Sequence, residues 1–173
     1  LGRSGRFLQT PDNLNSVNGI REFAVAKGAS VDYVPLTVPD LRIDNDQLTT
    51  LLDHADPGHS NLFAFPAQSN FSGVKHQLQV IDHAHNKGWD VLLDAAAFVP
   101  TNRLDLRAAR PDFVSISFYK MFGYPTGVGC LLVRTSMLAK LQRPWFAGGT
   151  VNFASVQGRL HILAPGEAGY EDG

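Results

Sequence analysis

Short apolar runs alternate along the chain with segments of helical periodicity. Six runs are apolar or β-branched and are bounded by turn residues, which predicts strands at residues 6–9, 31–36, 62–65, 91–94, 113–117 and 128–133. Between them, apolar residues recur at helical spacing. This alternation is typical of a mostly parallel sheet wrapped by helices, so the chain is predicted to have an α/β fold.

The helical segments combine an apolar stripe with capping residues. They predict helices at residues 17–24, with Gly28 as C-cap, at 44–52 and at 74–88, a short helical turn within 102–110, and a last helix from the cap Ser136 through Leu141. Asp44 with Gln47 three residues later resembles a capping box. Beyond Pro144 the pattern weakens. Residues 1–146 are therefore predicted to form one domain, and the glycine-rich residues 147–173 a segment that leads elsewhere.

The composition is that of an ordinary globular domain, with 173 residues, 44% hydrophobic and 18% charged. The formal net charge of −1 comes from scattered charges, so nucleic acid and anionic membranes are not expected partners. A single cysteine, the lack of a signal-peptide pattern and the lack of a run of about 20 apolar residues predict a soluble, cytoplasmic protein. Because Leu1 is not a methionine, we expect a piece of a longer chain.

Candidate chemistry lies just after the predicted strands, where open α/β sheets collect their ligands. Three polar segments, residues 66–70, 94–97 and 117–120, follow strands and are expected to converge on one edge of the sheet. The histidines do not suggest a metal site, because His76, His83 and His85 have neither metal-site spacing nor a converging carboxylate or cysteine.

Asp94 and Lys120 carry the most specific signal. A carboxylate at a buried strand end is costly unless a donor compensates it, although a cap or a salt bridge is the commoner explanation of one such residue. A single loop lysine is usually a solvated charge, but the rings of Tyr119, Phe122 and Tyr124 would disfavour its ammonium form. Together, an acid and an amine match pyridoxal phosphate, whose ring nitrogen needs an acidic partner and whose aldehyde needs an amine.

The segment LLDAAAFVPTNRLDLRAARPDFVSISFYKMFGYPTGVGCLLVR resembles the cofactor-binding core of class V aminotransferases, and within them molybdenum cofactor sulfurases and cysteine desulfurase-like proteins. FAFPAQSNFSG, NSVNGIREFA, FAGGT and the final EDG extend the resemblance in the same order. It implies an incomplete large domain of a fold-type I pyridoxal-phosphate enzyme, with three αβα layers and a mostly parallel sheet.

The resemblance assigns roles to individual residues. It implies that Lys120 forms the internal aldimine and that Asp94 pairs with the pyridine nitrogen. Ser117 and Tyr119 would lie near the cofactor phosphate, with Tyr119 where cysteine desulfurases commonly have histidine.

Three further residues follow from the same resemblance. Asn70 and Gln68 would stand near the ring face or its phenolic oxygen, and Thr150 would reach the phosphate of a neighbouring subunit, which implies a homodimer. Without the resemblance, Ser117, Asn70 and Thr150 would be read as ordinary loop caps.

The chain also departs from the family pattern. In DNHNSV the histidine is expected to stack on the cofactor, whereas Leu14 stands here and cannot move protons; Ala97 replaces a glutamine found in many desulfurases. The family's upstream phosphate-binding loop, its substrate-carboxylate arginine and its sulfur-accepting cysteine have no counterparts. Cys130 lies in an apolar strand, where a structural role is expected.

These residues predict a pyridoxal-phosphate-dependent enzyme, of sulfurtransferase or lyase type, that cleaves the C–S bond of an amino acid, cysteine above all, through an aldimine at Lys120. A sulfur acceptor would be a further partner. Two alternatives stay open: another class V reaction, such as racemisation, β-elimination or transamination, which Leu14 favours, and a non-catalytic homologue that retains the fold.

Overall fold

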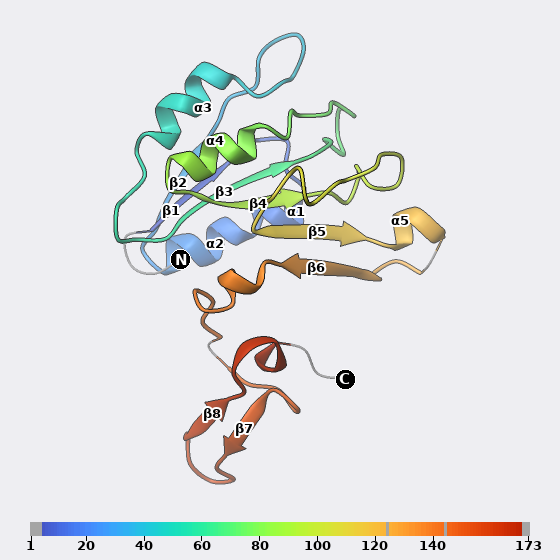
Figure 1. Cartoon of the computed structure of the whole chain (residues 1–173). Helices are drawn as coiled ribbons and strands as arrows, with labels where there is room; N and C mark the ends of the chain where they lie inside the picture. The colour runs from blue at the N-terminus through green and yellow to red at the C-terminus, as the bar shows by residue number, and fades with distance from the viewer. Residues whose placement is uncertain (1–4, 124, 144, 171–173) are drawn as a thin grey trace. The chain divides into compact units, whose positions relative to one another are not determined.

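The computed structural model describes residues 5–123, 125–143 and 145–170. It divides into two compact units, residues 1–132 and 133–173. Figure 1 shows the order of the elements along the chain. The domain boundary predicted between residues 146 and 147 falls inside the second unit.

A six-stranded sheet with the order β2-β1-β3-β4-β5-β6 forms the centre of the first unit. Its strands are β1 Arg6–Gln9, β2 Ser30–Tyr33, β3 Asn61–Pro66, β4 Asp90–Asp94, β5 Phe113–Ser117 and β6 Gly129–Val133. The pairs from β2 to β5 are all parallel, whereas β6 runs opposite to β5 (Figure 1). The sheet is therefore mixed but mostly parallel, as predicted.

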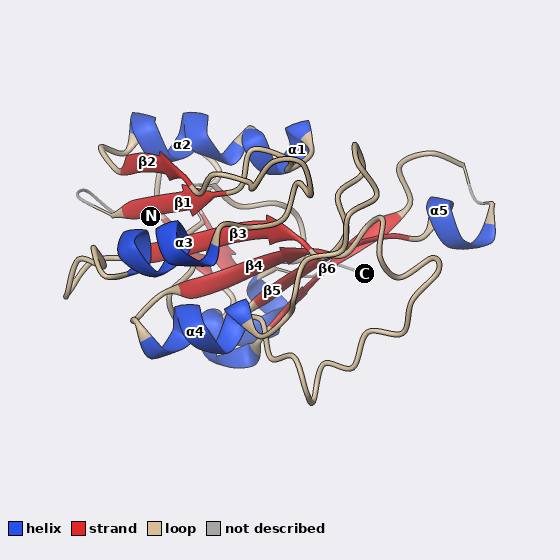
Figure 2. Cartoon of the chain, turned by 90° about the horizontal axis from the view of Figure 1, so that it is seen from above, coloured by secondary structure: helices blue, strands red, loops and turns tan. Residues whose placement is uncertain are grey.

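Helices cover both faces of this sheet. Helices α1 Asn15–Asn18 and α2 Ile20–Ala26 lie on one face, and α3 Asn45–Leu52 and α4 Val80–Asn86 lie on the other (Figures 1 and 2). The short helix α5 Tyr119–Phe122 follows β5. This arrangement confirms the three αβα layers. None of the helices in the described ranges is long and apolar enough to cross a membrane.

Two hydrophobic clusters fill the space between the layers. Successive side chains of a strand point to opposite faces, so Phe7 and Leu8 belong to different clusters. The larger cluster packs β-strand side chains against α3 and α4, and its fully buried Phe63 and Phe65 stack with ring centroids 5.2 Å apart. The smaller cluster packs Phe7 against α1 and α2.

The predicted strands are confirmed, with one correction. Five of the six agree with the structure within one residue at either end, and β1 and β5 agree at both ends. Strand β2 ends at Tyr33 rather than at Leu36, because Pro35 lacks the N–H that a continued ladder would use. Leu36 instead forms an isolated bridge with Ile43.

The helix predictions were less accurate. The cap of α3 is confirmed, since the Asp44 side chain accepts from the amides of Asp46 and Gln47. The helix predicted from residue 74 begins only at Val80, because the preceding segment bonds back to the exit of β3 through His76 N–H and Ala67 C=O. A short 3-10 helix, Thr135–Met137, replaces the helix predicted through residue 141.

The second unit contains a hairpin that the sequence pattern did not predict. Strands β7 Val151–Ala154 and β8 His161–Leu163 pair antiparallel, and a 3-10 helix follows at Gly166–Gly169. A Cβ atom at Gly169 would lie 2.4 Å from the Ala164 carbonyl oxygen, which explains a glycine at this close approach. Nearby, the Arg143 guanidinium lies over the Tyr170 ring, 5.8 Å from its centroid.

Candidate functional site

The three predicted polar segments share the carboxyl edge of the parallel strands. Register places Pro66 of β3 beside Asp94 of β4, and Asp94 beside Ser115 of β5. Asp94 therefore lies between the segment that follows β3 and the segment that follows β5. This is the edge where open α/β sheets bind ligands.

Asp94 is a buried carboxylate that is held by two neighbours. Its residue is 4% exposed, and its Oδ1 atom accepts from the Ala96 amide at 3.0 Å and from the Ser115 hydroxyl at 2.9 Å. Both hydrogen bonds go to Oδ1. The Oδ2 atom therefore keeps lone pairs for a further donor.

Lys120 lies on α5, directly after β5. Its Nζ atom donates to Oδ1 of Asn70 at 2.8 Å, across 50 residues of sequence. Helix α5 ends at Gly123, whose φ of 67° suits glycine. The structure thus brings Lys120 and Asn70 together, two residues that sequence reasoning assigned to the same site without predicting their contact.

Of the rings expected to surround Lys120, Phe122 is largely exposed to solvent. The Phe122 side chain is 68% exposed, and α5 contains no buried residue. Tyr124 lies outside the described residues. Lys120 is half-buried as a residue, its amine makes an exposed hydrogen bond, and this contact with Asn70 is polar rather than aromatic.

The other predicted residues of this edge take part in loop structure. Gln68 accepts from the Asn102 side chain at 3.2 Å, a contact that sequence reasoning missed. Ser117 is the half-buried last residue of β5. The amide of Tyr119 donates to the Val128 carbonyl at 3.3 Å, which joins the start of α5 to the start of β6.

Thr150 belongs to the second unit and caps its own turn. The residue is 2% exposed, and its hydroxyl donates to the Ala147 carbonyl at 2.8 Å and accepts from the Ala147 amide at 3.2 Å. This is the ordinary capping chemistry expected without the family resemblance. A role at a neighbouring subunit's phosphate stays a prediction.

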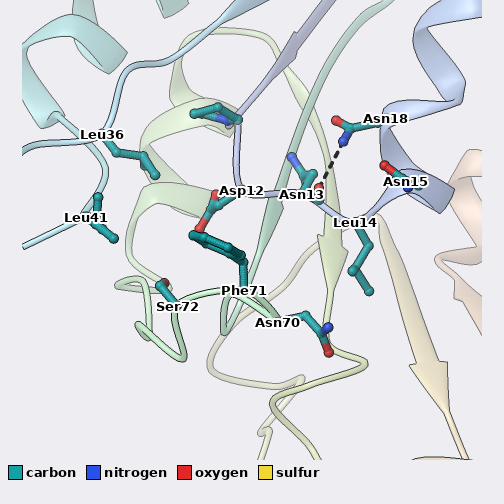
Figure 3. A pocket seen from close by; sticks show the side chains of 11 residues that line it. Asp12, Asn13, Leu14, Asn15, Asn18, Leu36, Leu41, Asn70, Phe71 and Ser72 are labelled. Atoms are coloured by element: carbon teal, nitrogen blue, oxygen red, sulfur yellow. Dashed lines mark hydrogen bonds between the residues drawn. The ribbon is translucent and has the colours of Figure 1, made fainter.

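A cavity of about 550 Å³ in the first unit is lined by three segments. The loop after β1, with α1, contributes Asp12 and Leu14, and residues 70–72 contribute Asn70 and Phe71 (Figure 3). Leu36 and Leu41, between β2 and α3, complete the lining. Among the residues that line the cavity, Asp12 is the one ionisable side chain. Asn70, which contacts Lys120, and Leu14, which replaces the expected histidine, therefore line the same cavity.

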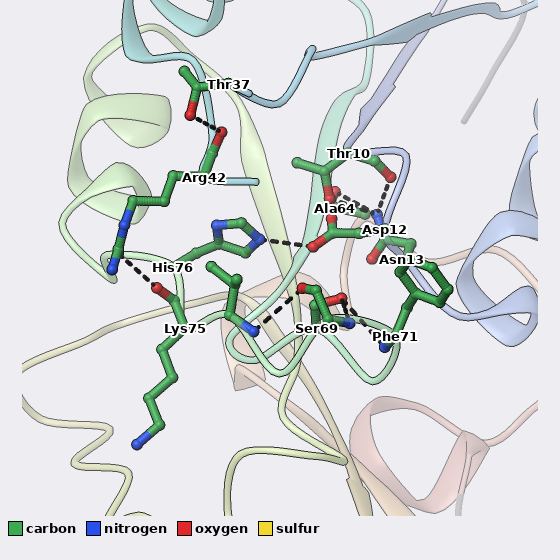
Figure 4. Close-up of polar contacts among 12 residues, drawn as sticks. Thr10, Asp12, Asn13, Thr37, Arg42, Ala64, Ser69, Phe71, Lys75 and His76 are labelled. Atoms are coloured by element: carbon green, nitrogen blue, oxygen red, sulfur yellow. Dashed lines mark hydrogen bonds and ion pairs between the residues drawn. The ribbon is translucent and has the colours of Figure 1, made fainter. Parts of the chain in front are cut away.

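A buried Asp–His pair lies beside this cavity. The Nε2 atom of His76 is 2.8 Å from Oδ2 of Asp12, and the two side chains are 1% and 5% exposed (Figure 4). Burial would raise the pKa of Asp12, but the hydrogen bond and charge of His76, with the nearby hydroxyls of Thr10 and Ser69, together lower it. No sequence signal pairs two residues 64 positions apart, and sequence reasoning had treated His76 only as a poor metal ligand.

The comparisons with known proteins agree with this fold. The family model described as "Aminotransferase class-V" matches residues 7–172, nearly the whole chain. The chain belongs to the class V aminotransferase family.

Within that family, the chain is similar to molybdenum cofactor sulfurases. It is 42% identical over 174 residues to the molybdenum cofactor sulfurase of Bombyx mori, covering 91% of this chain and 21% of that protein. It is 39% identical over 179 residues to that of Danio rerio, covering 97% of this chain and 21% of that protein. The chain thus spans about a fifth of the length of these curated relatives.

Solved structures with the same fold include cysteine desulfurases and a lyase. The apo cysteine desulfurase from Thermococcus onnurineus NA1 has a TM-score of 0.80 at 22% identity, covering 100% of this chain and 42% of that chain. The cystine C-S lyase C-DES, in complex with its reaction product cysteine persulfide, has a TM-score of 0.76 at 18% identity, covering 99% of this chain and 45% of that chain. A C-DES mutant with glycine covalently linked to its pyridoxal-phosphate cofactor matches equally well. At these identities the likeness shows the fold.

Proposed function

We propose that this chain forms the cofactor-binding part of a pyridoxal-phosphate-dependent sulfurtransferase or lyase that cleaves the C–S bond of cysteine. The observation that carries the proposal is the 2.8 Å contact between Lys120 and Asn70 at the same sheet edge as the buried Asp94. Similarity to molybdenum cofactor sulfurases supports the reaction class.

The residues at this edge fit the chemistry of the cofactor. Oδ2 of Asp94 can accept from a protonated pyridine nitrogen, because both of its described hydrogen bonds use Oδ1. The Lys120 amine suits the cofactor aldehyde, and Asn70 supplies a polar group beside that amine. Ser117 and Tyr119 follow on the same edge, where we propose that they contact the phosphate.

When bound, pyridoxal phosphate supplies an electron sink for the reacting amino acid. Asp94 would hold a proton on the ring nitrogen, and the Ala96 amide and the Ser115 hydroxyl fix the position of its carboxyl group. The Nζ atom of Lys120 would accept and return the proton of the substrate's α carbon. Asn70 would orient Nζ for this transfer.

Further parts of the proposal concern the partners. We propose that the protein acts as a homodimer in the cytoplasm and passes sulfur to an acceptor, with Thr150 reaching the partner's cofactor phosphate. In the described structure the Thr150 hydroxyl is bonded to Ala147 of its own turn. Sedimentation of the intact protein, compared with Thr150→Ala, tests both the dimer and this residue.

Substitution of Lys120 provides the central test. The intact protein, incubated with pyridoxal phosphate and freed of excess, should show the visible absorbance of the lysine-bound cofactor, and Lys120→Ala should abolish it. Lys75→Ala is the matched control, because Lys75 also donates to an asparagine, Asn102, at 2.6 Å but lies on an exposed loop. The same absorbance in wild type and Lys120→Ala would refute the proposal.

Leu14 favours a second candidate within the same family. It lines the cavity beside Asn70, at the position where the resemblance implies a histidine, and its side chain cannot transfer a proton. Racemisation, β-elimination or transamination would then replace sulfur transfer. Alanine with acceptor-bound sulfur indicates desulfuration, pyruvate with free sulfide indicates β-elimination, and D-amino acid indicates racemisation.

A further inference from the structure

The pair formed by Asp12 and His76 joins two of the segments that line the cavity. Asp12 belongs to the loop that follows β1, and His76 lies in the segment between β3 and α4 that also carries Asn70. Their side chains meet at 2.8 Å although they are 64 residues apart, and both are more than nine-tenths buried (Figure 4). A buried charged pair contributes little net stability compared with apolar packing, but removing one of its partners is strongly destabilising.

Each loop is fixed where the pair is attached. In the first loop, the Asn13 side chain donates to the Thr10 and Ala64 carbonyls at 2.9 and 3.0 Å, which ties the loop to β3. In the second, the His76 amide donates to the Ala67 carbonyl at 3.0 Å, so the imidazole projects from an anchored backbone. The side-chain pair therefore connects two anchored segments.

The second loop carries Asn70. The Ser69 hydroxyl oxygen accepts from the amides of Phe71 and Ser72 at 3.3 Å, and the Ser69 amide donates to the Val74 carbonyl at 2.8 Å, which makes a tight turn around Asn70. Oδ1 of Asn70 then accepts from Lys120. A chain of described contacts thus runs from the buried pair to the amine.

We propose that Asp12 and His76 form a positioning pair for the cofactor site: their contact holds the Asn70 turn against the Leu14 loop and thereby places the Nζ atom of Lys120. The proposal rests on the proposed function for the part that concerns the cofactor. Neither residue acts on the reacting atoms. Their role is to keep Asn70 where Lys120 meets it, and to keep the cavity open between the two loops.

The alternative is a pair that only supports the core, and the chain contains a second Asp–His pair for comparison. His85 Nε2 and Asp112 Oδ2 are also 2.8 Å apart, and the Asp112 side chain is also 5% exposed, whereas the His85 side chain is 27% exposed. Asp112 precedes β5 and accepts from the Val91 amide at 2.8 Å, so this pair lies at the opposite, amino edge of the strands. Breaking it tests the cost of removing the histidine beside a buried aspartate without touching the site.

The experiment compares His76→Phe, His76→Gln and Asp12→Asn with the control His85→Phe in the intact protein. The first readout needs no cofactor: chymotrypsin cleavage after Phe71, whose side chain is 90% exposed, measures loosening of the Asn70 turn in the apoprotein. The second readout is the dissociation constant of pyridoxal phosphate and the absorbance maximum of the bound cofactor. His76→Gln keeps an amide donor near the position of Nε2 and should behave like wild type.

His76→Phe and Asp12→Asn should speed cleavage after Phe71, shift the absorbance maximum and weaken cofactor binding roughly tenfold or more, the scale seen for residues that orient metal ligands. His85→Phe should leave the cleavage rate, the absorbance maximum and the cofactor affinity unchanged. Faster cleavage without a change in cofactor binding or spectrum, or no change in either readout, would overturn the positioning role. If wild type binds no cofactor, the proposed function fails, and the cleavage rates still decide whether the pair holds the turn.

Discussion

The hydroxyl of Ser115 donates a 2.9 Å hydrogen bond to Oδ1 of Asp94 and so joins the carboxyl ends of two neighbouring parallel strands. Because Asp94 is 4% exposed, this donor and the Ala96 amide replace the water that an ionised carboxylate would otherwise need. The same contact leaves Oδ2 for a ligand. A carboxylate that is held on one oxygen and open on the other is suited to bind a cationic N–H group.

Asp94→Asn should keep the fold and remove most of the activity. The amide is isosteric but carries no charge, so it cannot stabilise a protonated ring nitrogen, and we expect a loss of roughly 10²-fold or more in kcat. Ser115→Ala should cost far less activity, because it keeps the carboxyl group and removes only one of the two hydrogen bonds to Oδ1. Steady-state kinetics with circular dichroism as the folding control separates the two, and equal effects of both variants would contradict the role given to Asp94.

The contact between Asp12 and His76 should make the free energy of unfolding fall at acidic pH. The pKa of Asp12 is lowered in the folded chain relative to the ordinary value of about 3.9. Its contribution is therefore complete above that value and is lost as the pH falls through the folded pKa. Urea unfolding between about pH 6 and pH 3 should show a steeper loss for wild type than for Asp12→Asn.

The difference between the two proteins isolates Asp12 from other carboxylates, such as Asp53, whose pKa is lowered by its hydrogen bond to Lys87. Parallel stability curves for wild type and Asp12→Asn would show that the pair does not titrate as described. At neutral pH, His76→Phe should destabilise by about 3–5 kcal/mol, because it leaves a buried carboxylate without its partner.

Much of the sheet was predictable because each strand is a short apolar run that turn residues bound. Asp94 and Lys120 were predictable for the same reason: a strand end fixes the sheet edge to which a residue belongs. The contacts of Asn70 and His76 were not, since they depend on how two loops close on each other. The hairpin of β7 and β8 gave no signal because its strands are short and Phe153 and Ile162 are about half exposed, at 49% and 54%.

Gly129 is needed where β6 meets β5. A Cβ atom at this position would lie 2.5 Å from the Ile116 carbonyl oxygen and 3.6 Å from Cα of Ser117. Gly129→Ala should therefore push the strands apart, with a cost of about 1–3 kcal/mol as for other overpacked sites. Urea denaturation measures this cost, and Leu131→Ala on the same strand, 56% exposed, should change stability by about 0.5 kcal/mol or less.

Because Gly129 approaches Ser117, the same substitution should also disturb the segment that leads to Lys120. We expect Gly129→Ala to weaken pyridoxal-phosphate binding, whereas Leu131→Ala should not. An alanine that is tolerated without loss of stability or binding would show that the strands have room to separate.

Leu14→His tests whether the missing histidine decides the reaction. Leu14 is half-buried and lines the cavity of about 550 Å³ together with Asn70, so an imidazole at this position would face the same space and could exchange protons there. If sulfur transfer is limited by the lack of this group, Leu14→His should raise alanine formation from cysteine, with a pH profile that follows the added imidazole. Leu14→Phe is the matched control, since it covers the same surface with a ring that carries no proton. An equal gain with phenylalanine would assign the effect to stacking, and a shift in product from pyruvate to alanine with histidine alone would identify Leu14 as the residue that directs the chemistry.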